Sequence, residues 1–403
     1  MTMDSLELMR NLAQPSTGKI VLLVLDGLGG LPRPETGKTE LETADTPNLN
    51  RLAKEGTTSL IDIVSPGITP GSAAGHLALF GYDPLRFIIG RGALEAVGID
   101  FDLEPGDVAA RGNFCTVDKK GLITDRRAGR ITNEECARLC GLLDGMTIEN
   151  TRLFVRPVRE HRFIVVFRGD GLNPAVSDSD PQQPGVLPRA VSALKPGAAK
   201  TASITNKFIA QAKRLLAGQH PANMLLLRGF SERPCFPVMT EIYQLKPAAI
   251  AVYPMYRGLA RLVGMDILDP GTGLEDELKT LKANYSAYDF FFLHVKGTDS
   301  AGEDGDFERK VSVIEELDRA LPELIDTGPD VLIVTGDHST PAVLKGHSWH
   351  PVPVLLHSRW CRTDSATEFG ESACASGELG RFPATQIMPL AMAHALKLTK
   401  FGA

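Results

Sequence analysis

The 403-residue chain lacks any run of 18 or more apolar residues, so no transmembrane helix is predicted. Residues 1–17 contain no apolar signal core, and a cytoplasmic location is therefore expected. The six cysteines form no Cys-x-x-Cys pair, which predicts free, reduced thiols. The formal net charge is −6, without the concentrated basic surface that nucleic-acid binding requires. Neither a membrane nor a nucleic acid is an expected partner.

Length and composition predict a soluble protein of two domains. A chain of 403 residues is too long for one compact core, and 43% hydrophobic with 23% charged residues is typical of globular proteins. The candidate site residues come from both ends of the chain. Residues 98–243 differ from the flanking segments in their pattern of predicted strands, a polar loop and a helix. We therefore expect a discontinuous metal-binding domain, residues 1–97 and 244–403, with an inserted domain of residues 98–243. Assembly into a homo-oligomer is left open.

Three apolar, β-branched runs stop abruptly before polar residues. The runs are residues 19–25, 289–295 and 331–335. The polar residues that follow them are, in order, Asp26, Asp299, Asp337 and His338. Because sites in α/β proteins form beyond the carboxyl ends of parallel strands, we expect these side chains to meet. The pattern predicts an α/β fold whose mostly parallel sheet is flanked by helices.

Proline and polar residues mark further element boundaries. Thr46 followed by Pro47 predicts a helix with Thr46 as its N-cap. A Pro/Gly turn before Ser72 opens into an Ala-rich segment, so Ser72 is expected at or beside a helix N-terminus. Residues 351–356 contain two prolines and are predicted as a strand near the sheet edge, because proline removes ladder donors.

The candidate ligands form a set with a specific chemistry. They are Asp26, Asp299, Asp337, His338 and His347. Mixed carboxylate and imidazole ligands suit Mn²⁺ or Zn²⁺, and two such ions clamp the attacking and leaving oxygens of phosphoryl transfer. A helix N-terminus favours a phosphate, and a metal lowers the pKa of a serine hydroxyl, so Ser72 is the candidate nucleophile. Each residue alone would be interpreted as a cap, a turn or a surface histidine. The joint occurrence indicates a metal site.

Longer motifs surround these residues and extend over nearly the whole chain. The metal-site motifs are Asp26-Gly, Pro70-Gly-Ser72-Ala-Ala-Gly-His, Asp299-Ser-Ala-Gly-Glu303-Asp-Gly-Asp, Gly336-Asp-His338 and His347-Ser-Trp-His-Pro-Val-Pro. Others are Arg91-Gly-Ala-Leu-Glu-Ala, Arg111-Gly-Asn-Phe, Asp125-Arg-Arg-Ala-Gly-Arg130 and Leu227-Arg-Gly. Together they resemble the cofactor-independent (2,3-bisphosphoglycerate-independent) phosphoglycerate mutases of archaeal type, members of the alkaline phosphatase superfamily.

The resemblance implies an alkaline-phosphatase-like fold and a reaction. Ser72 would carry a phosphoryl group between the two hydroxyls of a small phosphorylated substrate, interconverting 3-phosphoglycerate and 2-phosphoglycerate. Of two divalent metal ions, one would be held by Asp26, Ser72, Asp337 and His338. The other would be held by Asp299 and His347. Mn²⁺ is the first candidate, with Mg²⁺, Co²⁺ and Zn²⁺ as alternatives.

The resemblance also implies that the inserted domain, a smaller α/β (α+β) unit, grips the substrate anions. Guanidinium forks suit both a carboxylate and a phosphate. The candidates are Arg111, Asn113, Arg130, Arg168 and Arg228. Arg126 or Arg127 could take the role of Arg130.

Two positions depart from the family pattern. The family usually has a histidine where this chain has Glu303, and a lysine before glycine where this chain has Arg257. Glutamate can ligate Mn²⁺ or Mg²⁺, so Glu303 is a candidate metal ligand that favours harder ions. Arg257 keeps a positive charge but does not donate a proton at neutral pH, and it is a candidate for substrate binding.

The same residues leave other functions open. A phosphotransferase would phosphorylate a small alcohol such as homoserine from a nucleotide or another donor. The chain has no Walker-type glycine loop, so a nucleotide would have to be held by the metals and arginines. A phosphomonoesterase would result if water entered the site. A non-enzymatic metal-binding protein would keep the fold alone, but the nearly complete ligand set favours an enzyme.

Overall fold

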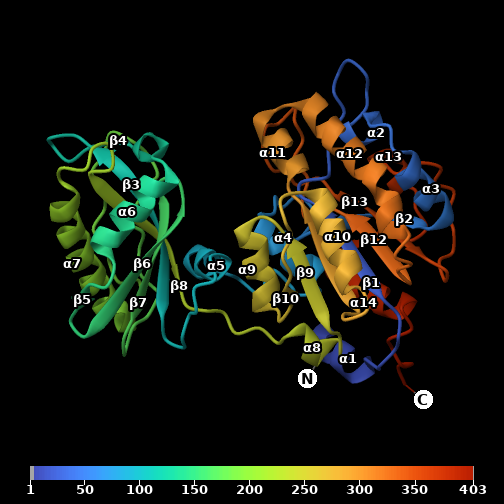
Figure 1. Ribbon diagram of the computed structural model, residues 1–403, viewed down its shortest axis with the longest axis horizontal. Helices are drawn as coiled ribbons and strands as arrows, with labels where there is room; N and C mark the ends of the chain where they lie inside the picture. Colours follow the sequence, from blue (N-terminus) through green and yellow to red (C-terminus); the bar gives the residue numbers. More distant parts are fainter. Residues whose placement is uncertain (1–3, 403) are drawn as a thin grey trace. The chain divides into compact units, whose positions relative to one another are not determined.

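The computed structural model describes residues 4–402, which form two units (Figure 1). The first unit contains the chain up to Ile88 and from Phe236 onward, and the second contains Ile89–Cys235. Both boundaries lie earlier than the predicted ones, by nine and eight residues. The reason is that helix α5 (Arg91–Gly98) packs on strands of the second unit, whereas α8 (Met239–Ile242) packs on α1 (Ser5–Leu12) of the first.

The first unit is built on an eight-stranded sheet of order β10-β9-β11-β1-β12-β13-β2-β14. The strands are β1 (Ile20–Leu25), β2 (Thr57–Asp62), β9 (Pro247–Ala251), β10 (Asp266–Ile267), β11 (Phe290–Val295), β12 (Val331–Thr335), β13 (Val352–Ser358) and β14 (Arg381–Pro383). All neighbours pair in parallel except β13, which is antiparallel to both β12 and β2. The predicted α/β class with a mostly parallel sheet is confirmed.

Helices cover both faces of this sheet. Those not yet given are α2 (Glu40–Thr43), α3 (Pro47–Glu55), α4 (Ser72–Leu79), α9 (Pro254–Leu262), α10 (Leu274–Asn284), α11 (Gly297–Asp304), α12 (Phe307–Ile325), α13 (Glu371–Cys374), η3 (Ala384–Gln386) and α14 (Ile387–His394). On one face, Leu23 and Leu293 share a buried apolar core with residues of α3, α10 and α12. On the other, Phe292 packs edge-on against Phe80 at the end of α4. Burial on both faces explains why the central strands are apolar throughout.

The three central strands place the candidate ligands side by side. β1 pairs in parallel with β11 on one side and β12 on the other, with Leu25 opposite Val295 and Val24 opposite Thr335. Every side chain of β1 is buried. The carboxyl ends of the three strands therefore lie together at one edge of the sheet, and the chain leaves each of them directly into polar residues.

The second unit is an α+β structure around an antiparallel sheet of order β4-β3-β7-β6-β5, with β8 paired to β3. Its strands are β3 (Val108–Val117), β4 (Ile123–Asp125), β5 (Thr147–Ile148), β6 (Thr151–Arg159), β7 (Arg162–Arg168) and β8 (Met224–Ser231). Its other elements are η1 (Ala128–Arg130), α6 (Asn133–Leu143), η2 (Pro196–Ala198) and α7 (Ala199–Leu216). Val108, Ala110 and Phe114 of β3 pack with α6 and α7. The alternate residues of β3 face the other way, toward the side on which α5 lies.

Two local predictions need correction. Thr46 precedes α3 as predicted, but its side chain makes no capping bond, and the buried carboxylate of Asp318 accepts the N–H groups of Asn48 and Leu49 instead. The strand predicted near the sheet edge is internal. Pro353 is tolerated there because it precedes Val354, the last residue paired with β12, so its nitrogen lies beyond the end of that ladder.

Among the helices of residues 4–402, none combines the length and apolar composition needed to cross a membrane. The six cysteines are free, as predicted.

Replacing Asp318 by alanine should destabilise the first unit by about 1–3 kcal/mol, because two N–H groups of α3 lose their acceptor in a buried setting. Urea unfolding followed by circular dichroism measures the change. Glu323→Ala on the same helix removes an exposed carboxylate that pairs with Lys282 and should stay within about 0.5 kcal/mol of the wild type. Equal stability of the two variants would contradict the capping role.

Candidate active site

The site is built from the segments that follow the three central strands. Asp26 follows β1, Asp299 lies in the first turn of α11 after β11, and Asp337 with His338 follows β12. All four side chains are buried. His347 comes from the loop before β13 and is partly exposed. The sequence thus predicted correctly that these residues gather at one edge of the sheet.

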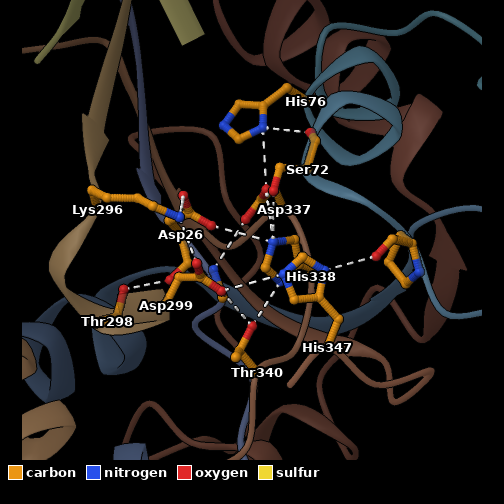
Figure 2. Close-up of polar contacts among 12 residues, drawn as sticks. Asp26, Ser72, His76, Lys296, Thr298, Asp299, Asp337, His338, Thr340 and His347 are labelled. Carbon is orange, nitrogen blue, oxygen red and sulfur yellow. Dashed lines mark hydrogen bonds and ion pairs between the residues drawn. The ribbon is translucent and has the colours of Figure 1, made fainter. Parts of the chain in front are cut away.

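Asp26, Asp337 and His338 form a first group whose ligand atoms all lie within 4.8 Å of one another (Figure 2). His338 Nε2 is 3.2 Å from Asp26 Oδ1 and 3.3 Å from Asp337 Oδ2. The other oxygen of Asp337 accepts the backbone N–H of Gly27 at 3.0 Å. The three side chains converge on one small volume.

This first group has the properties of a cation site. Asp26 Oδ1 and Asp337 Oδ2 are fully buried, and only the imidazole nitrogens of His338 and His76 lie within 3.3 Å of them among the described residues, without the geometry of a regular hydrogen bond. Burying unpaired carboxylate oxygens is costly unless a cation or donors compensate them. Two carboxylates and one imidazole are ligands for a divalent transition metal. The residues present therefore fit a bound metal ion.

Asp299, His338 and His347 form a second group, again with ligand atoms within 4.8 Å of one another. His347 Nε2 lies 3.5 Å from Asp299 Oδ1, and its ring stacks on that of His338 at 3.7 Å between centroids. His338 belongs to both groups, so the two groups are adjacent and share one imidazole ring. Glu303 Oε1 is 3.8 Å from His347 Nε2, and its side chain is exposed at the rim of this group.

Ser72 is the first residue of α4, as predicted, and its hydroxyl lies 3.2 Å from His338 Nε2 (Figure 2). At the start of a helix, free N–H groups and the helix dipole favour an anion. One turn later His76 contacts the backbone carbonyl of Ser72 at 2.8 Å and Asp337 Oδ2 at 3.2 Å. The hydroxyl therefore stands beside the first group, at a position where a phosphate is favoured.

Further residues around Asp26 were not identified from the sequence. Lys296 Nζ is 2.9 Å from Asp26 Oδ2 and 2.5 Å from Asp299 Oδ2, so one ammonium group bridges both ligand groups. The Tyr256 hydroxyl donates to Asp26 Oδ2, and His294 Nε2 lies 3.3 Å from the same oxygen. These neighbours surround Oδ2 of Asp26 and leave Oδ1 directed toward His338.

The electrostatics of the group follow from this arrangement. Burial opposes ionisation of Asp26, but contacts with His294 and His338 and the charge of Lys296 outweigh it and hold its pKa well below the usual range. Burial lowers the pKa of Lys296, yet Asp26 and Asp299 raise it more. Both groups are therefore charged at neutral pH, even though the site is buried.

Spacing could have indicated two of the missed residues. Lys296 lies three residues before Asp299, and His76 lies four residues after Ser72, which is one helical turn. For Tyr256 and His294 no local signal exists, because each meets Asp26 only through the packing of α9 and the register of β11.

A cluster of arginines forms a second candidate site, within the second unit. Arg111 on β3 lies directly opposite Arg228 on β8, and Asn113 lies opposite Arg162 on β7. Arg111 Nη1 pairs at 3.0 Å with the carboxylate of Glu95 on α5. Facing arginines on neighbouring strands repel each other, so this face of the sheet favours an anion.

Several arginines act electrostatically on the carboxylate of Glu95. Burial raises the pKa of Glu95, while Arg111, Arg91, Arg162 and Arg228 act to lower it. Burial and the neighbouring arginines lower the pKa of Arg111 to about 10. Arg228 Nη1 also lies 3.9 Å from the buried carboxylate of Asp180, so four guanidinium groups share two carboxylates, and a small anion would balance the excess positive charge. Arg91 and Arg162 were missed by the sequence, because only the strand register and the position of α5 bring them here.

Of the other predicted substrate residues, Arg126 adjoins this cluster, because its partner Asp180 also lies 3.9 Å from Arg228. Arg126 makes a bidentate pair with buried Asp180, at 3.1 and 2.6 Å, and Arg130 is exposed at the end of η1. Arg168 is engaged by Asp107 at 2.7 Å and Glu104 at 2.6 Å. The position of Arg168 does not support the predicted substrate contact, because two carboxylates already occupy its guanidinium group.

In the first unit, Arg257 lies half-buried on α9, directly after Tyr256.

The mostly parallel sheet and the buried carboxylate–histidine groups beside a helix-terminal serine define an α/β protein whose candidate site suits metal-assisted phosphoryl chemistry. Residues 53–223 match the family model of the 2,3-bisphosphoglycerate-independent phosphoglycerate mutases. The chain belongs to this family, as its motifs predicted. A relative from Thermus thermophilus, named a probable mutase of this kind, is 50% identical over 100% of both chains, and one from Aquifex aeolicus is 49% identical over 99% of this chain and 100% of its own.

Solved structures agree with this assignment. A cofactor-independent phosphoglycerate mutase from Thermoplasma acidophilum is 32% identical with a TM-score of 0.73, covering 94% of this chain and 100% of its own. A protein from Pyrococcus horikoshii is also 32% identical, with a TM-score of 0.83 and coverage of 96% and 99%.

Replacing Arg228 by methionine should weaken the binding of inorganic phosphate about tenfold or more, because one charged donor leaves the arginine cluster. Isothermal titration calorimetry with phosphate measures the affinity. Arg168→Met removes the same charge from the same unit but outside the cluster, so its phosphate affinity should equal that of the wild type. If both variants bound phosphate like the wild type, the cluster would not be an anion site.

Proposed function

We propose that this protein interconverts 3-phosphoglycerate and 2-phosphoglycerate through a phosphoserine at Ser72. Family membership over the full chain supports the reaction. The observation that carries the phosphoserine route is the contact of the Ser72 hydroxyl with His338, beside two buried carboxylate oxygens and at the N-terminus of α4. A nucleophile, a cation site and an anion-binding helix end occur together there.

The proposed reaction conserves atoms and charge in two half-reactions. The Ser72 hydroxyl oxygen bonds to phosphorus while the bond between phosphorus and the O3 of glycerate breaks, and the proton of the serine hydroxyl ends on O3. In the reverse sense, O2 of glycerate then takes the phosphoryl group and its proton returns to Ser72. The sum is a shift of one phosphoryl group between two hydroxyls of the same molecule.

We infer that two divalent cations serve this site, with Mn²⁺ as the first candidate. Asp26, Ser72, Asp337 and His338 would hold one, and Asp299 and His347, with Glu303 at the rim, the other. Bound cations would supply charge stabilisation and a more acidic serine hydroxyl. The chain itself fixes the orientation of both carboxylates. Tyr256 and Lys296 bind Asp26 Oδ2, and the backbone N–H of Gly27 donates to Asp337 Oδ1.

The arginine cluster is the proposed partner of the substrate anions. A phosphoglycerate carries a carboxylate and a phosphate, and both accept bidentate guanidinium bonds. Arg111 and Arg228, with Asn113 beside them, are the predicted residues that the cluster contains. Arg91 and Arg162 join them.

The mutase is favoured over the alternative acceptors because relatives that match over nearly the full chain carry that name. Phosphorylation of a small alcohol and hydrolysis of a phosphomonoester would use the same Ser72 chemistry, so the product identifies the function. A cytoplasmic location and a homo-oligomer stay predictions from the sequence.

Replacing Ser72 by alanine should lower turnover by roughly 10³-fold or more, since it removes the hydroxyl that accepts the phosphoryl group in the proposed route. The assay follows 3-phosphoglycerate by ³¹P NMR with Mn²⁺ present, where the wild type should yield 2-phosphoglycerate. Ser312→Ala, an exposed hydroxyl on α12, should retain wild-type turnover. Free phosphate as the wild-type product would indicate a phosphomonoesterase. If the wild type left 3-phosphoglycerate unchanged, transfer to a small alcohol would be favoured instead. Wild-type turnover by Ser72→Ala would exclude the phosphoserine route.

Replacing Asp337 by asparagine should weaken Mn²⁺ binding by about tenfold or more, because one buried carboxylate leaves the first group. Equilibrium dialysis with metal analysis gives the affinity. Asp330→Asn lies at the other end of the same strand, where its carboxylate accepts the Lys19 N–H, and should bind Mn²⁺ normally. Unchanged metal content in Asp337→Asn would contradict the ligand role.

A further inference from the structure

Thr340 touches one ligand of each candidate metal group. Its side-chain oxygen lies 2.8 Å from Asp299 Oδ1 and 2.9 Å from His338 Nδ1 (Figure 2). Asp299 belongs only to the second group, and His338 is the imidazole shared with the first. Thr340 is completely buried, so no solvent competes for these two contacts.

Counting protons fixes the direction of both hydrogen bonds. The carboxylate of Asp299 can only accept, so the single hydroxyl proton of Thr340 goes to it. The contact with His338 is then a hydrogen bond only if Nδ1 carries a proton and donates it to the hydroxyl oxygen. Nε2, which faces Asp26, Asp337 and Ser72, is thereby the ring nitrogen available to a cation.

The backbone around Thr340 is held as tightly as its side chain. The ammonium group of Lys310, buried on α12, donates to the carbonyl oxygens of Thr340 at 3.0 Å and Gly29 at 3.1 Å. These two carbonyls belong to the loops that follow β12 and β1. Glycines leave the space that Thr340 needs: a Cβ on Gly27 would come within 2.5 Å of its hydroxyl oxygen, and one on Gly302 within 2.2 Å of its carbonyl oxygen.

We propose that Thr340 is a positioning residue that couples the two metal groups, by fixing the ring of His338 and the carboxylate of Asp299 through one hydroxyl. Partners behind a metal ligand that fix its tautomer typically change metal affinity by about 10–100-fold when removed. Because Thr340 serves a ligand of each group, its loss weakens both groups together. The inference rests on the metal sites of the proposed function and is independent of the substrate.

Thr340→Val keeps the shape of the side chain and removes the hydroxyl. We expect it to weaken the binding of the first and the second Mn²⁺ by about 10–100-fold each in a calorimetric titration, and Thr340→Ser to restore both. Thr335→Val is the matched control: it removes a buried threonine hydroxyl of β12 that donates to Pro353 O at 2.9 Å and touches no candidate ligand. Its Mn²⁺ affinities should equal those of the wild type.

The pattern of affinities separates the possible failures. If Thr340→Val binds both ions like the wild type, or if only one ion is weakened, the coupling is wrong. If the wild type itself binds no Mn²⁺, the metal sites of the proposed function fail first.

A second measurement tests the hydrogen-bond directions on which the coupling depends, and it needs no variant. In ¹⁵N NMR of the histidine-labelled wild type, free of metal or loaded with diamagnetic Mg²⁺, His338 Nδ1 should carry a proton in both states. An unprotonated Nδ1 would overturn the inferred hydrogen-bond directions, whether or not Thr340→Val folds.

Discussion

The structure depends on two carboxylates that are buried close together at the ends of adjacent parallel strands. Asp26 and Asp337 are both fully buried, and each reaches the same nitrogen of His338. Like charges in a medium of low dielectric constant repel strongly and raise each other's pKa. Burial and Asp26 act to raise the pKa of Asp337, but the contacts with His338 and His76 outweigh them and leave this pKa below its usual value. The carboxylates therefore remain charged because imidazole rings lie against both of them and the Lys296 ammonium group lies against Asp26.

The neighbouring packing follows from this constraint. Helix α4 must bring Ser72 and His76 against the end of β12, and it does so at Gly75, where a Cβ would lie only 2.2 Å from the carbonyl oxygen of Asp337. Lys296 supplies a fixed positive charge between Asp26 and Asp299. The second unit presents the opposite balance, with several arginines around Glu95. The first unit thus contains a buried acidic group of side chains, and the second unit contains a basic cluster.

Continuous apolar runs made the central strands predictable from the sequence. The runs of β1, β11 and β12 end directly at Asp26, near Asp299 and at Asp337, and such runs are typical of strands that are buried on both faces. Ser72 was equally visible, because a Pro/Gly turn precedes it. The positions of Asp26, Ser72, Asp337 and His338 were therefore predictable from local sequence patterns, whereas their assignment to two metal ions came from the family resemblance.

Residues that act through long-range packing could not be predicted. Asp318 caps α3 from 270 positions away along the chain. The prediction that the Thr46 side chain caps this helix was therefore wrong. The domain boundaries shifted because α5 packs on β8, which is far from it in sequence. Arg91 and Arg162 reach the cluster only through this packing and the register of β3 with β7. Strand register and helix docking decide these contacts, and neither has a local signal.

Anomalous X-ray diffraction from crystals of the Mn²⁺-loaded protein tests the central claim most directly. The account predicts two manganese peaks, one contacted by Asp26, Asp337 and His338 and the other by Asp299 and His347. No peak at these residues in crystals that contain stoichiometric manganese, or peaks at other places only, would contradict it.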